Sequence, residues 1–227
     1  MNRHICFPLF FFSLGLIVIL SSPGFGQESD VIFRDDFSGS ALEKGWVWEP
    51  SPDGETSYSL IQNPGFLTLI NKSGGGMWDK NTGAPKLYRT IGTEEISITV
   101  KISEYKPVQE WEEAGLFIRQ DKNNWFKIQK AFNGKNEQLD CAGYVNGTVK
   151  EFRTPKYEGG DLWLRIKKKD NNYSFTYSKN NQFYIFLGMI PADPYLSPKV
   201  GVFASCWNFP KPNMVKFDFF EITKVIK

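Results

Sequence analysis

Short segments in which apolar and polar residues alternate recur along this chain, and they restrict its fold more than any other feature. In the segment 95–102, Ile96, Ile98, Val100 and Ile102 alternate with polar or charged residues. Alternation with a period of two is typical of a strand with one buried face. Similar segments lie at 114–120, 124–131, 161–168, 172–178, 199–205 and 215–223. No window shows sustained helical periodicity with capping residues, so the sequence predicts an all-β protein.

Turn signals separate these segments. Asn133-Gly134 and Asn146-Gly147 are dipeptides that tolerate positive φ and favour hairpins, and Asn171-Asn172 and Asn180-Asn181 are weaker versions. Short strands with turns every ~8–12 residues indicate a sandwich or a barrel. Apolar strands near both ends of the chain favour the sandwich, because the terminal strands of jelly rolls commonly lie close together. We therefore predict a two-sheet antiparallel jelly-roll sandwich, with a closed barrel as the main alternative.

The first 26 residues have the pattern of a secretory signal peptide. Arg3 and His4 precede a nearly unbroken apolar run from Ile5 to Leu20, and a turn-prone stretch with Gly24 and Gly26 follows. The run is shorter than the roughly 20 residues that span a bilayer, so cleavage between residues 26 and 27 is favoured over a membrane anchor. We expect a secreted chain, extracellular or periplasmic, whose residues 27–227 form one domain. No later segment is long and apolar enough to cross a membrane.

The charge balance and the histidine content exclude several functions. Cleavage would remove only Arg3 from the charged residues and leave a net charge of about +1, which gives no argument for binding nucleic acid. The only histidine, His4, would leave with the signal peptide. Ser-His-Asp and Cys-His catalysis would then lack a base, and histidine-ligated zinc is excluded. A disulfide between Cys141 and Cys206 is one possibility, and two buried free thiols are the other.

A polar and aromatic strand face is the main candidate for a ligand site. In three of the alternating segments the aliphatic residues would line the core, so their neighbours would lie together on an exposed face. Indole rings stack on the C–H face of a sugar ring, and the polar side chains hydrogen-bond its hydroxyl groups or pair with a uronate or sulfate. We therefore predict a glycan-binding face. Its residues are Arg119, Trp125, Lys127, Gln129, Trp163 and Arg165.

Other placements of these aromatic residues remain open. Trp and Arg can equally cover a sheet by stacking on one another, or form a second layer of core under loops. Trp78, Trp111 and Trp207 fall in predicted loops or strand ends. Loop aromatics at such positions either rim a binding cleft or close the end of a sandwich.

Several segments together resemble a known family. The opening "FRDDFSGSALEKGWVWEP", with "EEAGLFIRQDKNNWFKIQKA", "KVGVFAS" and "VKFDFFEIT" following in order, resembles the concanavalin A-like domain at the C-terminus of family 43 glycoside hydrolases. It is also similar to the domain-of-unknown-function family labelled "regulation of enolase", which shares this fold. The likeness covers roughly residues 31 to 225. It implies a concanavalin A-like sandwich. The sequence departs from the family pattern in that no glycosidase catalytic domain precedes the sandwich, so we expect a module that stands alone.

The "E-x-D-x-x-E" signature of catalytic laminarinase-type members is missing from the sequence. We therefore predict a secreted, non-catalytic carbohydrate-binding or polysaccharide-associated module, with a glycan as partner. One alternative is a glycoside hydrolase that uses two of the carboxylates among Glu110, Glu112, Glu113 and Asp121. A second is a polysaccharide lyase that uses Tyr144, Lys127 and Arg119. The third is a surface interaction scaffold. No feature of the sequence specifies an oligomeric state.

No cofactor is required for the predicted function, and a structural calcium ion is one further possibility. Asp35, Asp36 and Asp218 lie in the two terminal strands, and related sandwiches often hold calcium between such strands. Calcium takes six to eight oxygen ligands, so carbonyl groups would have to complete the shell. The alternative is that these carboxylates face solvent or accept hydrogen bonds in turns.

Overall fold

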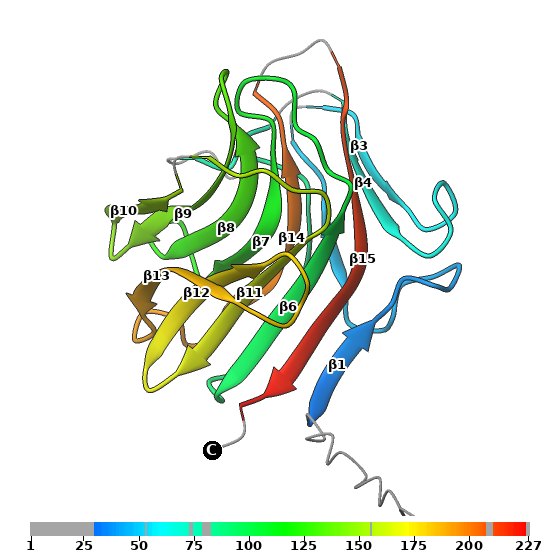
Figure 1. Ribbon diagram of the computed structural model, residues 1–227. Helices are drawn as coiled ribbons and strands as arrows, with labels where there is room; N and C mark the ends of the chain where they lie inside the picture. Colours follow the sequence, from blue (N-terminus) through cyan, green and yellow to red (C-terminus); the bar gives the residue numbers. More distant parts are fainter. Residues whose placement is uncertain are drawn as a thin grey trace, which may run out of the picture.

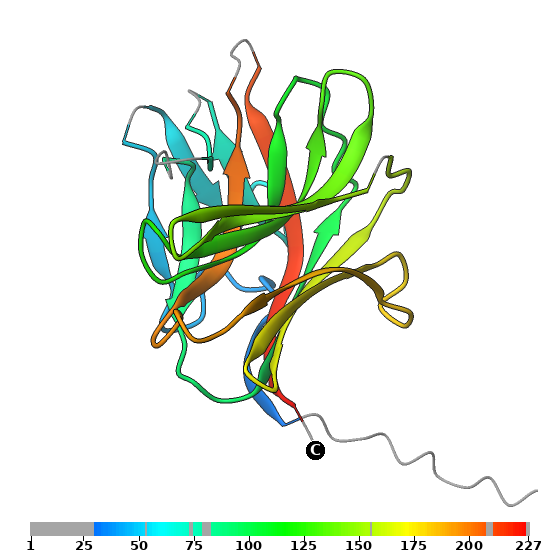
Figure 2. The same cartoon turned by 90° about the vertical axis from the view of Figure 1, so that its left-hand side faces the viewer.

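The computed structural model describes residues 30–52, 54–72, 75–78, 83–154, 156–207 and 211–225. The predicted signal peptide and its cleavage site lie outside these ranges. No helix of the described chain is long and apolar enough to span a membrane. The described residues form fifteen strands in two antiparallel sheets, which Figures 1 and 2 show as separate layers. The predicted two-sheet sandwich is confirmed, and the barrel alternative is wrong.

The first sheet has eight strands, seven of them in the order β13-β12-β11-β6-β15-β4-β3, and β1 pairs with β15 beside this path. The long strand β15 accommodates both β4 and β1, because β4 pairs with its first half and β1 with its last residues. The strands are β1 (Val31–Asp35), β3 (Thr56–Ser59), β4 (Leu67–Asn71), β6 (Ile96–Ser103), β11 (Leu162–Lys169), β12 (Asn172–Ser178), β13 (Ile185–Pro191) and β15 (Asn213–Lys224).

The second sheet has seven strands in the order β10-β9-β8-β7-β14-β5-β2 and carries the candidate site. Consecutive strands β7 to β10 are neighbours in space, so their outward side chains form one continuous surface. The strands are β2 (Val47–Glu49), β5 (Lys86–Thr90), β7 (Glu113–Arg119), β8 (Trp125–Phe132), β9 (Glu137–Val145), β10 (Thr148–Arg153) and β14 (Lys199–Ser205).

The main core lies between the sheets and contains the aliphatic residues that the alternation predicts. Ile98 and Val100 of β6, Leu116 and Ile118 of β7 and Leu164 of β11 are fully buried there. The opposite face of the second sheet carries a smaller apolar cluster of Met77, Ala84, Tyr88, Phe117, Trp125 and Phe203, with Tyr144 packed against it. Met77 and Ala84 belong to the segment between β4 and β5. This face therefore has a second apolar layer.

The hairpin turns agree with the sequence prediction, with one shift. Asn146 and Gly147 have φ values of 51° and 74° and join β9 to β10 directly. Between β11 and β12, however, the two turn residues are Asp170 and Asn171, with φ values of 48° and 57°. Asn172 already pairs with Lys169 in the ladder, so the expected Asn171-Asn172 turn is wrong by one residue. Asp and Asn both tolerate the left-handed region, and the sequence does not distinguish the two registers.

The two cysteines lie in different surroundings. Cys141 of β9 is part of the main core, and Cys206 follows β14 near the end of the sheet. Both are buried, and neither forms a disulfide in this structure. The disulfide alternative is therefore not realised.

Candidate functional site

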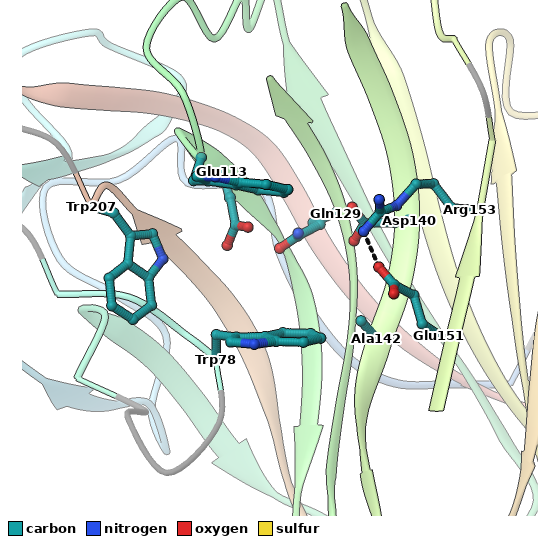
Figure 3. Close-up of a pocket in the computed structure, with 9 residues that line it drawn as sticks. Trp78, Glu113, Gln129, Asp140, Ala142, Glu151, Arg153 and Trp207 are labelled. Carbon is teal, nitrogen blue, oxygen red and sulfur yellow. Dashed lines mark hydrogen bonds and ion pairs between the residues drawn. The ribbon is translucent and has the colours of Figure 1, made fainter. Parts of the chain in front are cut away.

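A cleft opens on the outward face of the second sheet. It has a volume of about 400 Å³. Strands β7, β8 and β9 supply its floor, β10 supplies one rim, and three tryptophans from loops supply its walls (Figure 3). We call it the tryptophan cleft. Its lining residues are Trp78, Trp111, Glu113, Gln129, Asp140, Ala142, Glu151, Arg153 and Trp207.

Strand register explains why the floor residues meet. Gln129 of β8 is opposite Asp140 of β9 on one side and Gly115 of β7 on the other. Their side chains share one face because cross-strand partners point the same way in an antiparallel pair. Gly115 is a site of close backbone packing, because a Cβ there would come within 2.1 Å of Ile128 O. Ala142, two residues after Asp140, has a short side chain, so space remains above this part of the floor.

Local backbone conformation and close packing hold two of the wall tryptophans, Trp111 and Trp207, in place. Trp111 has a φ of 60°, which is rare for a bulky side chain and marks a locally strained position. Trp207 lies against Gly76, where an added Cβ would come within 1.8 Å of the indole ring. Trp78 and Trp207 remain 37% and 39% exposed, which leaves indole surface free for a ligand. Figure 3 shows both rings at the edge of the cleft, with Gln129 and Asp140 deeper inside.

A buried ion pair occupies one side of the floor. Lys127 Nζ lies 2.8 Å from Glu113 Oε2, and the side chains of the two residues are 1% and 6% exposed. Ser205 Oγ donates a second hydrogen bond to the same carboxylate oxygen at 3.0 Å. Lys127 Nζ also lies 5.9 Å from the centre of the Trp78 ring. Because two buried charges neutralise each other here, this side of the floor presents a polar but electrically balanced surface.

The other side of the floor contains hydrogen-bond acceptors without donors. Asp140 Oδ2 accepts a hydrogen bond from Gln138 Nε2 at 3.0 Å, but Asp140 Oδ1 is buried with no partner. Gln129 Oε1 on the adjacent strand is likewise buried without a partner. Unpaired polar atoms in a protein interior are costly and call for an explanation such as a ligand or water.

Burial also changes the protonation of Asp140. Desolvation raises the pKa of its carboxyl to about 6, against the lowering effects of Lys127, Gln138 and Arg153. Glu113 adds a smaller upward shift of the pKa through charge repulsion. A carboxyl that titrates near neutral pH inside a cleft is a common property of functional sites.

Four of the residues predicted to bind a ligand lie on this face, but only two of them are at or beside the floor of the cleft. Gln129 lines the cleft and Lys127 is fixed beside it by Glu113. Trp125 is fully buried in the second apolar layer, where its ring centre lies 5.6 Å from that of Tyr144. Its predicted exposure is therefore wrong, because the segment before β5 covers it. The strand polarity was right, and only the loop cover was not visible in the sequence.

Arg119 lies on the same face but is held elsewhere. Its Nη2 forms an ion pair with Glu49 Oε2 at 2.5 Å, next to the buried Lys86. Burial lowers the pKa of Lys86 to about 8. The three residues of the lyase alternative are thus separately engaged, with Arg119 bound to Glu49, Lys127 bound to Glu113 and Tyr144 packed on Trp125.

Trp163 and Arg165 belong to the other sheet, so the expected common face with Trp125 is wrong. Trp163 on β11 is half-buried, and Lys101 Nζ lies 5.2 Å from its ring centre. Arg165 stacks on Tyr184 at 3.5 Å and donates a hydrogen bond to Thr99. Alternation within a strand shows which residues share a side of that strand, but it does not show which sheet the strand joins.

The three acidic residues considered for calcium have protein partners. Asp35 is buried and accepts hydrogen bonds from the backbone of Phe37 and Glu43 and from Trp46 Nε1. Asp36 pairs with Arg34, and Asp218 pairs with Lys101. Within the described ranges, no group of three or more His, Cys, Asp or Glu side chains is placed to hold a metal ion. Asp35 thus anchors the loop after β1, and the calcium site stays a prediction without support from this geometry.

The main residue that sequence reasoning missed is Asp140. It lies in "EQLDCAGYV", where Leu139 and Cys141 point to the core and Asp140 and Ala142 point to the cleft. The alternation in this segment puts Asp140 on the outward face of the strand, but a single acidic residue on a strand face usually points into solvent. Trp78, Trp111 and Trp207 were recognised as candidates for the rim of a cleft, and all three line it.

The fold and the sequence match known proteins. Residues 34–223 match the family described as beta xylosidase C-terminal concanavalin A-like domain. This confirms the resemblance to the C-terminal sandwich of family 43 glycoside hydrolases. A search of curated proteins returns no match.

Solved structures share the sandwich at low sequence identity. The GH43 protein BlXynB from Bacillus licheniformis aligns with a TM-score of 0.73 and 22% identity, over 85% of this chain and 39% of that one. A xylan beta-1,4-xylosidase from Bacillus halodurans C-125 aligns with a TM-score of 0.69 and 18% identity, over 84% of this chain and 39% of that one. This chain thus spans well under half the length of either protein.

A third structure has a different coverage. A functionally unknown protein from Saccharomyces cerevisiae aligns with a TM-score of 0.67 and 16% identity, over 80% of this chain and 97% of that one. Nearly the whole of that chain is therefore a sandwich of this kind. At these identities the similarity shows the fold alone.

Proposed function

Since the chain belongs to the family of beta xylosidase C-terminal concanavalin A-like domains, we propose that it is an exported, non-catalytic module that binds a glycan in the tryptophan cleft. The observation that carries the proposal is the pairing of exposed indole surface with buried acceptors. Trp78 and Trp207 provide apolar ring faces, and Gln129 Oε1 and Asp140 Oδ1 lack donors. A sugar supplies both complements at once, because its C–H face stacks on indole and its hydroxyl groups donate hydrogen bonds.

The similar proteins support a glycan as the ligand class. One of them is named as a xylan beta-1,4-xylosidase, and another as a GH43 protein. Domains that accompany such enzymes work next to polysaccharides, so a surface that retains the chain on a glycan fits this family. The fold itself hosts many functions, and the argument therefore rests on the cleft.

The test is a binding measurement on matched tryptophan variants. Purified protein is titrated calorimetrically with soluble plant and algal oligosaccharides, and the same series is repeated with Trp78→Ala and Trp163→Ala. Trp163 is a partly exposed tryptophan on the other sheet and serves as the control. We expect binding to fall at least about tenfold for Trp78→Ala, a loss of ~1.4 kcal/mol, and to stay unchanged for Trp163→Ala. Equal effects of both variants, or no binding to any glycan, would refute the proposal.

Export is the second part of the proposal. Expression of the full sequence in a bacterial host with an intact secretion system should give a mature protein whose N-terminus is Gln27. N-terminal sequencing of the protein recovered outside the cytoplasm measures this directly. Recovery of an unprocessed chain from the cytoplasmic fraction alone would contradict export.

A second candidate function is glycoside hydrolysis by two carboxylates. Asp140 has a pKa raised to about 6 and Glu113 is held by Lys127, and both line the cleft. Two carboxyl groups in different environments are the arrangement that acid–base hydrolysis of a glycosidic bond requires. Release of reducing ends from oligosaccharides, abolished by both Asp140→Asn and Glu113→Gln, would replace the binding proposal. Binding without release of reducing ends would eliminate hydrolysis.

A further inference from the structure

We propose that the tryptophan cleft is selective for uncharged sugar units with several free hydroxyl groups, and that it rejects uronates and sulfated sugars. This inference rests on the proposed glycan binding and specifies its ligand class. The sequence alone left both neutral and anionic sugars open, because it placed Arg and Lys on the candidate face. The contacts of those cations decide between the two classes.

Among the described residues, the cationic side chains of the floor and rim of the cleft have anionic partners. Lys127 is bound to Glu113, and Arg119 is bound to Glu49. Arg153 lines the rim and pairs with Glu151 of the same strand (Figure 3). Arg165, the remaining predicted cation, lies on the other sheet over Tyr184. At these cations, a carboxylate or sulfate on a ligand would therefore compete with a carboxylate that is already in place.

The unsatisfied atoms of the floor are acceptors. Asp140 and Gln129 are each 2% exposed, and the oxygen that each leaves unpaired needs a donor. A sugar hydroxyl donates to such an oxygen, whereas a uronate carboxylate has no proton to donate at neutral pH. The same carboxylate would lie close to the Asp140 charge in a site with little water, where repulsion between like charges is strong.

The size of the cleft fits a short piece of a glycan. About 400 Å³ is within the roughly 300–1,000 Å³ range of sites that enclose a small ligand. The walls remain partly open, since Trp78 and Trp207 are more than one-third exposed. The cleft thus holds a short run of sugar units stacked on indole, with hydroxyl groups toward Gln129 and Asp140.

Titration of Asp140 gives the selectivity a pH dependence. The charged groups that face it are Glu113 from β7, Lys127 from β8 and Arg153 from β10, and the Gln138 amide lies on its own strand. Its pKa is raised to about 6, so lowering the pH from 7.5 to 5 converts most of the population to the neutral carboxylic acid. Uronates keep their charge over this range. The discrimination between neutral and anionic sugars should therefore weaken as the pH falls.

The experiment compares matched ligands at two pH values. Wild-type protein is titrated with xylohexaose and cellohexaose as neutral probes and with a galacturonic acid hexamer as the anionic probe, at pH 7.5 and pH 5. We expect at least about tenfold tighter binding of a neutral probe at pH 7.5, and a several-fold smaller ratio at pH 5. Tighter binding of the galacturonic acid hexamer at pH 7.5 would overturn the inference while leaving glycan binding intact. Absence of binding to every probe would refute the proposed function instead.

Two variants and one control variant test the stated cause. Glu151→Gln frees Arg153 from its ion pair and should raise affinity for the galacturonic acid hexamer at least fivefold. Glu158→Gln removes an exposed carboxylate that pairs with Lys156 away from the cleft, and should have no effect. Asp140→Asn should remove the pH dependence of the selectivity. Near-ultraviolet circular dichroism checks that each variant is folded, and an unchanged selectivity in folded Glu151→Gln and Asp140→Asn would contradict the assigned residues.

Discussion

Asp140 is a buried carboxyl group in the cleft whose charged form lowers the stability of the fold. Burial raises its pKa to about 6 from the 3.8 of an ordinary aspartate, so the folded chain holds its proton more tightly than the unfolded chain does. Between these two values the folded state binds more protons, and the free energy of unfolding falls as the pH rises. The penalty is absent below about pH 4 and complete above about pH 6. A shift of this size corresponds to about 3 kcal/mol at most.

The first prediction follows from this sign. Asp140→Asn removes the buried charge and keeps an oxygen for Gln138. We expect the variant to be about 1–3 kcal/mol more stable than the wild type at pH 7.5, and the difference to approach zero at pH 4. Urea unfolding at a series of pH values measures it. A variant that is less stable at pH 7.5 would show that the carboxylate has a partner that stabilises it.

Lys127 and Glu113 give the opposite case, in which two buried charges depend on each other. Their side chains are almost completely buried, and Nζ to Oε2 is 2.8 Å. Removal of Lys127 leaves the buried Glu113 carboxylate with the hydrogen bond from Ser205 but without its counter-charge.

We therefore expect Lys127→Met to lower the free energy of unfolding by about 3–5 kcal/mol. The double variant Glu113→Gln/Lys127→Met should recover at least half of that loss, because it leaves no unpaired charge. Chemical unfolding of the wild type, Lys127→Met, Glu113→Gln and the double variant measures the coupling between the two side chains in a double-mutant cycle. Additive losses would mean that the two side chains act independently.

The residue scale is also where the sequence was least informative. Alternation places Lys127 and Gln129 on the face that carries the cleft, but it does not reveal their contacts, because these depend on Glu113 and Asp140 in other strands. Asp140 itself had no distinguishing neighbours in the sequence. Its burial and its missing partner arise only when β8, β9 and β10 pair.

At the scale of elements, the strands follow the sequence closely. The segment 199–205 coincides with β14, and 172–178 coincides with β12, since alternation and turn residues define both ends. The loops were not predictable to the same degree. The segment before β5 carries Trp78 to the rim and Met77 over Trp125, and no periodic pattern specifies where such a segment lies.

This loop gives the third prediction. An added Cβ at Gly76 would come within 1.8 Å of the Trp207 ring, so Gly76→Ala must displace the indole from its place at the cleft. We expect a several-fold loss of glycan affinity and a changed tryptophan fluorescence spectrum, with a small effect on stability. Gly160→Ala is the control, because nothing lies within 4 Å of its added Cβ. An unchanged affinity in Gly76→Ala would indicate that Trp207 does not contact the ligand.

At the scale of the whole molecule, the second sheet is buried on both faces over part of its area. Its inner face meets the main core, and its outer face carries the second apolar layer around Trp125. Local alternation predicted the inner face of the main core correctly. The choice of sheet for β11 and the cover over Trp125 are long-range properties, which explains why the predicted face of six residues was divided between two sheets.

The last prediction separates a core tryptophan from a surface tryptophan. Trp125 is fully buried and its Nε1 has no partner among the described residues, so it acts mainly through apolar packing. Trp125→Ala should lower the free energy of unfolding by about 3–5 kcal/mol, as for other large core residues, and Trp125→Phe should lower it by less. Trp163→Ala, a half-buried position on the other sheet, should cost clearly less than Trp125→Ala. Thermal and urea unfolding of the three variants measure these losses. Equal losses for Trp125→Ala and Trp163→Ala would contradict a second apolar layer, because an outer face without one would give both indoles the same partial burial.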